Sequence, residues 1–241
     1  MQVYQIKSKN LGSYVSFDAT GSVVRKLKRP VGISGHIFLY QGVLCSSGDH
    51  IPVVQMLSES HTINSIAQWL TEWKQAGATV PKEAVCDFSL ALLGALVKAF
   101  TPYPNLKTYI NQCFGVLTRN VASKLPPCFI RIDVAHCIKL ISRWECLRQA
   151  GNRVREFYLR AMAQLLQSTS LDDARELIHS ISVVAFSESE GNDDRGTPVL
   201  SETSKVQLKR RIAEGRVLPT VTEDDYGVEM KEQEDELWSR G

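Results

Sequence analysis

The chain has 241 residues, which is enough to bury a core as one large domain or as one domain with an insertion. Its 44% hydrophobic and 22% charged residues are typical of a soluble globular protein. No apolar run has the length of a membrane span, and the first residues lack the hydrophobic region of a signal peptide. We therefore expect an intracellular protein without a membrane partner.

The net charge of +2 hides an uneven distribution along the chain. The segment 219–241 has eight acidic and two basic side chains and a net charge of −6, which leaves +8 on the remainder. A moderately basic body suits a polyanionic partner such as DNA. The acidic segment is predicted to be a disordered tail.

The cysteines form no CxxC pair, and several of them lie inside apolar runs. This pattern favours buried free thiols in a reducing compartment and argues against structural zinc. The six residues concerned are Cys45, Cys86, Cys113, Cys128, Cys137 and Cys146.

The first predicted elements are strands. Residues 14–27 are rich in Val and aromatic residues and are interrupted by Thr20-Gly21, which predicts a strand, a tight turn and a second strand. Residues 36–46 and 51–57 are predicted to form a hairpin around Gly48-Asp49. An antiparallel meander is therefore expected at the start of the chain.

Helices alternate with short strands after this meander. Thr62 is the expected N-cap of a helix over about 63–76. A buried strand over 80–86 then ends on Asp87, and a helix follows from Ser89. An antiparallel meander followed by a helix and a parallel strand predicts a mixed sheet of the α/β class.

The pattern becomes mainly helical toward the carboxyl end. A partly helical piece over 106–117 precedes a strand at 128–134, which leads into a helix at 135–150. Residues 152–186 are helical throughout, with Ser170 as the expected N-cap of the second of two helices. Three tryptophans are predicted to be core residues: Trp69, Trp73 and Trp144.

A linker is expected over 187–203 and a basic helix over 204–218, before the acidic tail. About one basic side chain per turn would fit a helix that follows a phosphate backbone, although a solvated helix face is the competing interpretation. The candidate DNA contacts are Lys205, Lys209, Arg210 and Arg211.

Two aspartates stand at or near the ends of predicted strands. Asp18 lies in the first strand, and Asp87 closes the fourth. Carboxylates from separate strands of one sheet can share a divalent metal, the minimum apparatus for phosphodiester chemistry. The competing interpretations are that Asp18 forms a turn and that Asp87 caps the following helix.

The sequence around these aspartates resembles that of Mutator-like (MULE) DDE transposases, whose catalytic core is ribonuclease-H-like. The matching segments are SFDATGSVVRK, IPVVQMLSESHTINSIAQWLTEWK and AVCDFSLALLGALVKAF. The family's C-x-x-H signature corresponds to Asp133-Val134-Ala135-His136, where an aspartate replaces the cysteine. The resemblance covers about residues 13 to 150.

The resemblance implies a ribonuclease-H-like core over 1–150 with a mixed sheet flanked by helices, followed by an all-helical insertion over 151–186. It also implies a DNA partner, a nuclear location, and Mg²⁺ or Mn²⁺ held by Asp18 and Asp87 for DNA strand cleavage and transfer. Asp133 and His136 are candidates for supporting this site, with capping or core packing as the favoured competing roles.

A third carboxylate, usually a glutamate beyond the insertion, completes the family's site, and we cannot place it in this chain. We expect it past Gly241, in which case the chain is a fragment and inactive alone. Two alternatives stay open. One is a domesticated module that binds DNA or protein without catalysis, through its helical region or as a homo-oligomer; the other is an independent nuclease that uses Glu145.

Overall fold

The computed structural model describes residues 14–24, 28, 30, 32, 35–46, 49–119, 124–189 and 191–215. The described residues form two compact units, of which the first ends at Asp133 and the second begins at Val134. The predicted acidic tail and its carboxylates lie outside the described residues.

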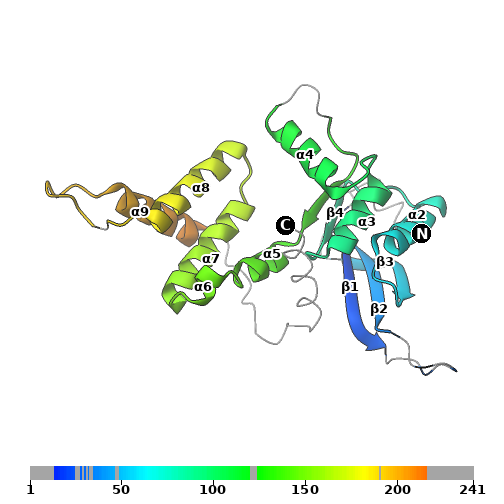
Figure 1. Cartoon of the computed structure of the whole chain (residues 1–241). Helices are drawn as coiled ribbons and strands as arrows, with labels where there is room; N and C mark the ends of the chain where they lie inside the picture. Colours follow the sequence, from blue (N-terminus) through cyan, green and yellow to red (C-terminus); the bar gives the residue numbers. More distant parts are fainter. Residues whose placement is uncertain are drawn as a thin grey trace. The chain divides into compact units, whose positions relative to one another are not determined.

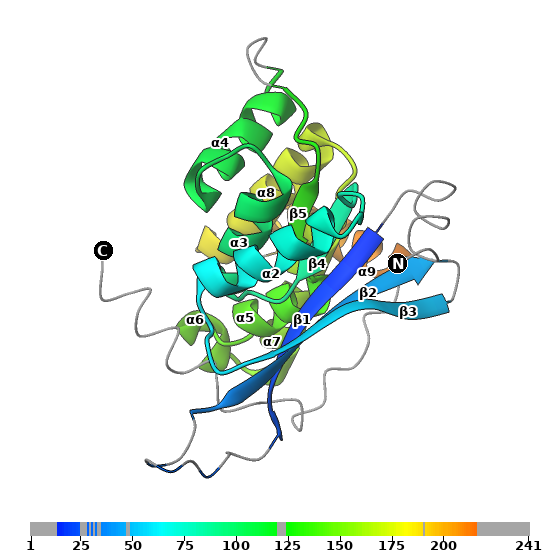
Figure 2. The same cartoon turned by 90° about the vertical axis from the view of Figure 1, so that its right-hand side faces the viewer.

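The first unit is built on a five-stranded mixed sheet with the order β3-β2-β1-β4-β5 (Figures 1 and 2). β1, β2 and β3 form an antiparallel meander, and β4 is parallel to both β1 and β5. The protein is therefore of the α/β class, as predicted. The strands are β1 (Tyr14–Val24), β2 (Ile37–Ser46), β3 (Asp49–Ser58), β4 (Glu83–Cys86) and β5 (Phe129–Ile132).

The turn predicted at Thr20-Gly21 is wrong, because β1 continues as one strand to Val24. Thr20 pairs with Leu39 of β2, and the register shifts between Thr20 and Val24. Pairing with β2 thus prevails over the local turn preference, and the irregularity falls where the turn was expected.

Three helices belong to the first unit: α2 (Ile63–Gln75), α3 (Leu90–Phe100) and α4 (Leu106–Leu117). Each begins at a side chain that accepts a backbone N–H of the first turn, namely Thr62, Ser89 and Asn105. Thr62 is thus the N-cap that the sequence predicts.

The core lies between the sheet and the helices. Alternate residues of β1, such as Val15 and Phe17, point to the same side and are fully buried against α2 and α3. Phe17 lies between two aromatic rings, with its centroid 6.3 Å from that of Trp73 and 5.8 Å from that of Phe100. Trp69 and Trp73 are therefore core residues, as predicted.

A side chain of α4 covers part of the outer edge of β5. The backbone N–H of Ile130 donates to the Tyr109 hydroxyl oxygen at 2.6 Å, and Tyr109 is 4% exposed. The N–H of the preceding residue, Phe129, points to the opposite side, toward β4, and donates to the carbonyl of Lys82. Tyr109 therefore satisfies a backbone group that the sheet itself leaves unpaired.

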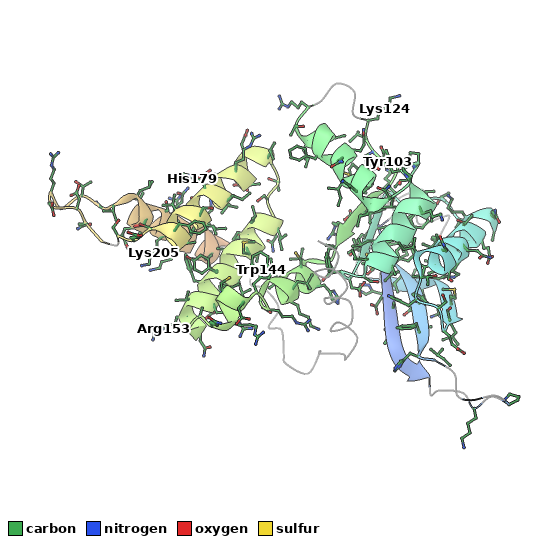
Figure 3. The ribbon with its side chains drawn as sticks, in the orientation of Figure 1. Tyr103, Lys124, Trp144, Arg153, His179 and Lys205 are labelled. Atoms are coloured by element: carbon green, nitrogen blue, oxygen red, sulfur yellow. The ribbon has the colours of Figure 1, made fainter. Side chains whose placement is uncertain are left out.

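The second unit is helical. Its helices are α5 (Val134–Ile141), α6 (Glu145–Arg148), α7 (Asn152–Leu166), α8 (Leu171–Phe186) and α9 (Leu200–Glu214). The single helix predicted over 135–150 is broken between α5 and α6, and Trp144 at the break is 52% exposed rather than buried (Figure 3). α5 and α6 belong to this unit, although the sequence grouped them with the core.

Two small cores hold this unit together. Ile138, Ile141 and Leu147 pack around Ala163 of α7. Ala161, Leu177 and Leu208 join α7, α8 and α9. Ser170 accepts the N–H of Asp173 and begins α8, as predicted. The basic helix begins at Leu200, inside the segment predicted as a linker.

All six cysteines are free thiols. Burial raises the pKa of Cys86 and raises that of Cys128 to about 12, so both remain protonated. No helix of the described part is long and apolar enough to cross a membrane.

Candidate metal-binding site

Asp18 lies within β1 and not at a turn. It is paired with Gln41 of β2, and its side chain is exposed. Because Phe17 faces the helix-covered core, alternation along the strand directs Asp18 to the opposite face of the sheet. Its Oδ2 accepts a hydrogen bond from the hydroxyl of Thr20, 2.9 Å away, which orients the carboxylate.

Asp87 directly follows β4 and is half-buried. It is not the N-cap of α3, because that role belongs to Ser89, whose hydroxyl oxygen accepts the N–H of Leu92. The Oδ1 of Asp87 instead accepts the N–H of Ser89 at 3.2 Å. The helix start therefore holds the carboxylate of Asp87 in place from two residues away.

The strand register brings the two aspartates to the same end of the sheet. Phe17 of β1 is paired in parallel with Cys86 of β4, and Asp18 and Asp87 are the next residues on these neighbouring strands. Both carboxylates raise the pKa of the Cys86 thiol, after the larger effect of its burial. Both charges thus act on one residue, as expected for carboxylates near one another.

Asp133 follows the next parallel strand. Ile132 of β5 is paired with Cys86, and the N–H of Asp133 donates to the carbonyl of Cys86 at 2.8 Å. An aspartate therefore stands one residue beyond each of three paired residues on adjacent parallel strands, Phe17 of β1, Cys86 of β4 and Ile132 of β5. His136 lies in α5 of the second unit, where it is exposed.

The sheet face that carries Asp18 has a polar cluster across β1, β4 and β5. Arg131 forms an ion pair with Glu83, and its guanidinium lies 5.6 Å from the centroid of the Tyr14 ring. Burial raises the pKa of Tyr14, and the positive charge of Arg131 opposes this effect. The cluster joins three strands on the face opposite the helices.

Carboxylate oxygens are the ligands that Mg²⁺ prefers, and one or two protein carboxylates with substrate phosphates are a common set. Asp18 and Asp87 fit this requirement by chemistry and by strand position. Within the described residues, no group of three or more His, Cys, Asp and Glu side chains is arranged to hold a metal ion. Glu145, the third carboxylate of the nuclease alternative, lies in α6 of the second unit and pairs with Arg148.

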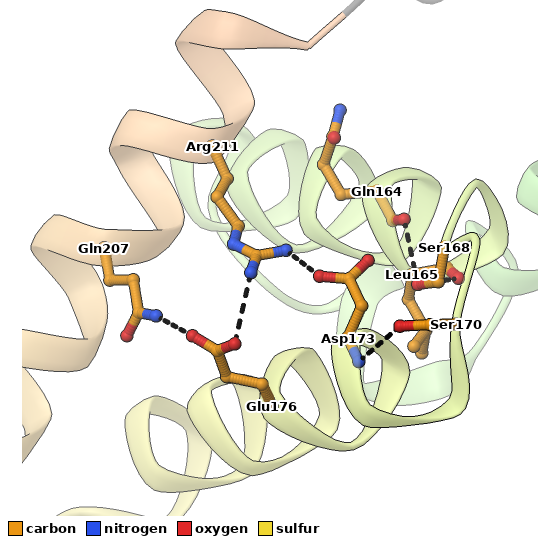
Figure 4. Close-up of polar contacts among 8 residues, drawn as sticks. All are labelled: Gln164, Leu165, Ser168, Ser170, Asp173, Glu176, Gln207 and Arg211. Atoms are coloured by element: carbon orange, nitrogen blue, oxygen red, sulfur yellow. Dashed lines mark hydrogen bonds and ion pairs between the residues drawn. The ribbon is translucent and has the colours of Figure 1, made fainter.

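The candidate DNA contacts on α9 differ in their surroundings. Arg211 binds two carboxylates of α8, Asp173 and Glu176, and the hydrogen bond that it donates to Asp173 is the main cause of its raised pKa (Figure 4). Lys205 and Arg210 lie within 4 Å of glutamates of their own helix (Figure 3 labels Lys205). Lys209 is exposed. The position of Arg211 favours a structural role, and DNA contact by these residues stays a prediction.

Sequence reasoning did not single out the two hydroxyl residues that contact the aspartates. Thr20 was assigned to a turn, and Ser89 was expected only to begin a helix. The spacing Asp-x-Thr in a strand and Asp-x-Ser before a helix is the signal that could have identified them.

No protein-family model matches the chain. Over 199 residues, or 83% of its length, the chain is 39% identical to the 120.7 kDa protein in the NOF-FB transposable element of Drosophila melanogaster. The chain is related to a transposable-element protein. It spans 19% of the length of that relative. The similarity supports an origin of this chain from a transposon.

Proposed function

We propose that the chain is the partial catalytic core of a DDE transposase of the Mutator-like type, with a ribonuclease-H-like fold. Its ancestral reaction would be metal-dependent cleavage and transfer of DNA strands in the nucleus, with Asp18 and Asp87 as metal ligands. The chain on its own is expected to be inactive, because one carboxylate of the site has not been identified.

The observation that carries this proposal is the parallel pairing of Phe17 with Cys86. It supports a shared metal because the next residue on each strand is an aspartate. The sheet order β3-β2-β1-β4-β5, with one antiparallel meander and two parallel strands, is consistent with the proposed fold. The transposable-element relative supports the ancestry.

The residues of this chain would prepare the site before a metal binds. The hydroxyl of Thr20 donates to Asp18, and the N–H of Ser89 donates to Asp87. These two hydrogen bonds fix the orientation of the carboxylates. A divalent ion bound there would stabilise negative charge on phosphate oxygens during strand cleavage.

Asp133 is our candidate for support of this site. Its position after β5 continues the series of Asp18 and Asp87 across the sheet. His136, in α5 of the second unit, stays a candidate through the resemblance alone. We also propose that the helical second unit corresponds to the all-helical insertion of the family.

Metal binding is the direct test. We expect the full chain to bind Mn²⁺, as measured by electron paramagnetic resonance. Asp18→Asn and Asp87→Asn should each lower the affinity for Mn²⁺ at least tenfold. The matched control is Asp172→Asn, which removes a carboxylate that is 94% exposed in α8 and should leave Mn²⁺ binding unchanged. Equal Mn²⁺ binding by all four proteins would overturn the metal site.

Plasmid nicking distinguishes the alternatives. Nicking with Mg²⁺ or Mn²⁺ that both aspartate variants abolish would make this chain an enzyme by itself. DNA binding that survives chelator and both substitutions, without Mn²⁺ binding, would support the module without catalysis.

A further inference from the structure

His61 lies in the connection between β3 and α2 and is half-buried. Its ring is stacked against two aromatic rings of β2. The ring centroid is 4.9 Å from that of Phe38, with an angle of 29° between the planes, and 5.9 Å from that of Tyr40, with an angle of 16°. The imidazole is thereby held in one orientation.

The hydrogen bonds of Tyr40 assign the roles of the two ring nitrogens. The Tyr40 hydroxyl has one proton and two acceptors within reach, the carbonyl of Ser60 at 3.1 Å and Nδ1 of His61 at 2.7 Å. We assign this proton to Ser60, so that the hydroxyl oxygen accepts from Nδ1 of His61. Burial lowers the pKa of His61 and favours the neutral ring. With the proton on Nδ1, the other nitrogen, Nε2, is an acceptor.

Nε2 of His61 lies 3.2 Å from the hydroxyl of Ser89, which is 2% exposed. The Ser89 hydroxyl therefore donates to His61, while its oxygen accepts the N–H of Leu92 and caps α3. The N–H of Ser89 in turn donates to Oδ1 of Asp87. One series of hydrogen bonds thus runs from Tyr40 through His61 and Ser89 to Asp87.

We propose that His61 is a positioning residue for Asp87, which it orients through Ser89. The inference rests on the proposed function, since it concerns the carboxylate assigned to the metal. By accepting the Ser89 proton, His61 fixes the rotamer in which Ser89 caps α3. The backbone of residues 87–89 then presents its N–H to Asp87. A buried Ser89 hydroxyl without this acceptor would lose a hydrogen bond and favour another rotamer.

Two substitutions test the hydrogen bonds of the two ring nitrogens of His61 separately. In His61→Gln the side-chain amide reaches the position of Nε2 and can accept from Ser89, but it loses Tyr40. In His61→Asn the amide reaches the position of Nδ1 and keeps Tyr40, but it loses Ser89. Both remove the imidazole and its stacking, so each controls for the packing loss of the other.

The experiment measures Mn²⁺ affinity and amide hydrogen exchange on the full chain. We expect His61→Asn to weaken Mn²⁺ binding by about three- to tenfold, below the effect usual for a direct neighbour of a ligand. The amides of Ser89 and Leu92 should exchange faster in the same variant. His61→Gln should restore both properties to near the wild-type values.

Equal Mn²⁺ affinity and equal amide exchange in wild type, His61→Asn and His61→Gln would overturn the proposal. Equal losses in both variants would also overturn it, because they would indicate packing alone. If His61→Asn does not fold, Ser89→Gly replaces it, since glycine is tolerated at an N-cap but cannot donate to His61. Mn²⁺ binding unaffected by Asp18→Asn and Asp87→Asn would contradict only the metal site, and amide exchange would still decide whether His61 holds Ser89.

Discussion

Phe17 of β1 and Cys86 of β4 are partners in a parallel register, and each is 1% exposed in the same core. The residues that follow them are Asp18 and Asp87. The packing that fixes Phe17 and Cys86 therefore also fixes the relative positions of the two carboxylates. Fold stability and site geometry depend on the same strand pair.

Gly42 of β2 should not accept a side chain, because it lies opposite Phe17. A Cβ at this position would be 2.7 Å from Cγ1 of Val54 and 2.9 Å from Cε1 of Phe17, whose ring is held by Trp73 and Phe100. We expect Gly42→Ala to lower the free energy of unfolding by about 1–3 kcal/mol, as measured by urea denaturation.

Gly94→Ala is the matched control. Its Cβ would be 2.8 Å from Cδ1 of Ile63, but this side chain is 43% exposed and its end can rotate away. Alanine also gains up to about 1 kcal/mol over glycine inside a helix, so we expect little net change. Equal destabilisation by both substitutions would contradict a specific effect of the restricted space beside Phe17.

Tyr109→Phe should destabilise the first unit. It leaves the buried N–H of Ile130 without the hydroxyl that accepts it, at an expected cost of about 1–3 kcal/mol. Tyr103→Phe is the control, since the Tyr103 hydroxyl makes no hydrogen bond within the described residues. Its ring centroid lies only 6.0 Å from that of Tyr109. Thermal unfolding of the two variants should differ clearly, and similar midpoints would exclude a role for the edge contact.

Arg211→Ala should weaken the packing of α9 on α8. Arg211 is 27% exposed and contacts Asp173 and Glu176, so its removal leaves two carboxylates without their cation, at an expected cost of about 1 kcal/mol. Arg210 is 69% exposed, and among the described residues its ion pair is with Glu214 of the same helix, so Arg210→Ala should cost less than about 0.5 kcal/mol. Chemical denaturation of both variants tests the difference, and a larger loss for Arg210→Ala would contradict it.

The stability of the first unit should decrease as the pH falls below the ordinary pKa of histidine. Burial lowers the pKa of folded His61, so the unfolded chain takes up a proton that the folded chain does not. The contribution of neutral His61 to the free energy of unfolding is complete above the pKa that this histidine has in the unfolded chain. It is lost as the pH falls toward the lower pKa of the folded protein. Urea unfolding between about pH 5 and pH 7.5 should show a shallower slope in His61→Gln. The matched control is His179→Gln, because it makes the same substitution at an exposed histidine outside the first unit.

Much of the fold could be predicted because its signals are local. Side-chain patterns identified the positions of all five strands, and Thr62 and Ser170 marked the starts of two helices. The turn at Thr20-Gly21 was predicted wrongly because partner strands decide whether a glycine-containing stretch bends. β2 pairs with residues on both sides of it. The prediction that Trp144 is buried was wrong for a similar reason, since the break before α6 turns its side chain outward.

The aspartates could be identified from sequence, but the residues around them could not. His61 contacts Tyr40 and Ser89, which are 21 and 28 residues away along the chain. No spacing rule connects positions on β2, before α2 and before α3. Only the closed fold brings them together, so the series of hydrogen bonds that reaches Asp87 is a property of tertiary structure.

The parallel register also limits how this segment can vary in length. One residue inserted or deleted between Val15 and Phe17 would exchange the two faces of β1 and turn Asp18 toward the helices. Related sequences that keep both aspartates should therefore show length changes in the connection from β1 to β2 or around Pro102 and Pro104. In β1 and β4, on the amino-terminal side of the aspartates, insertions and deletions should be absent even where the side chains have diverged.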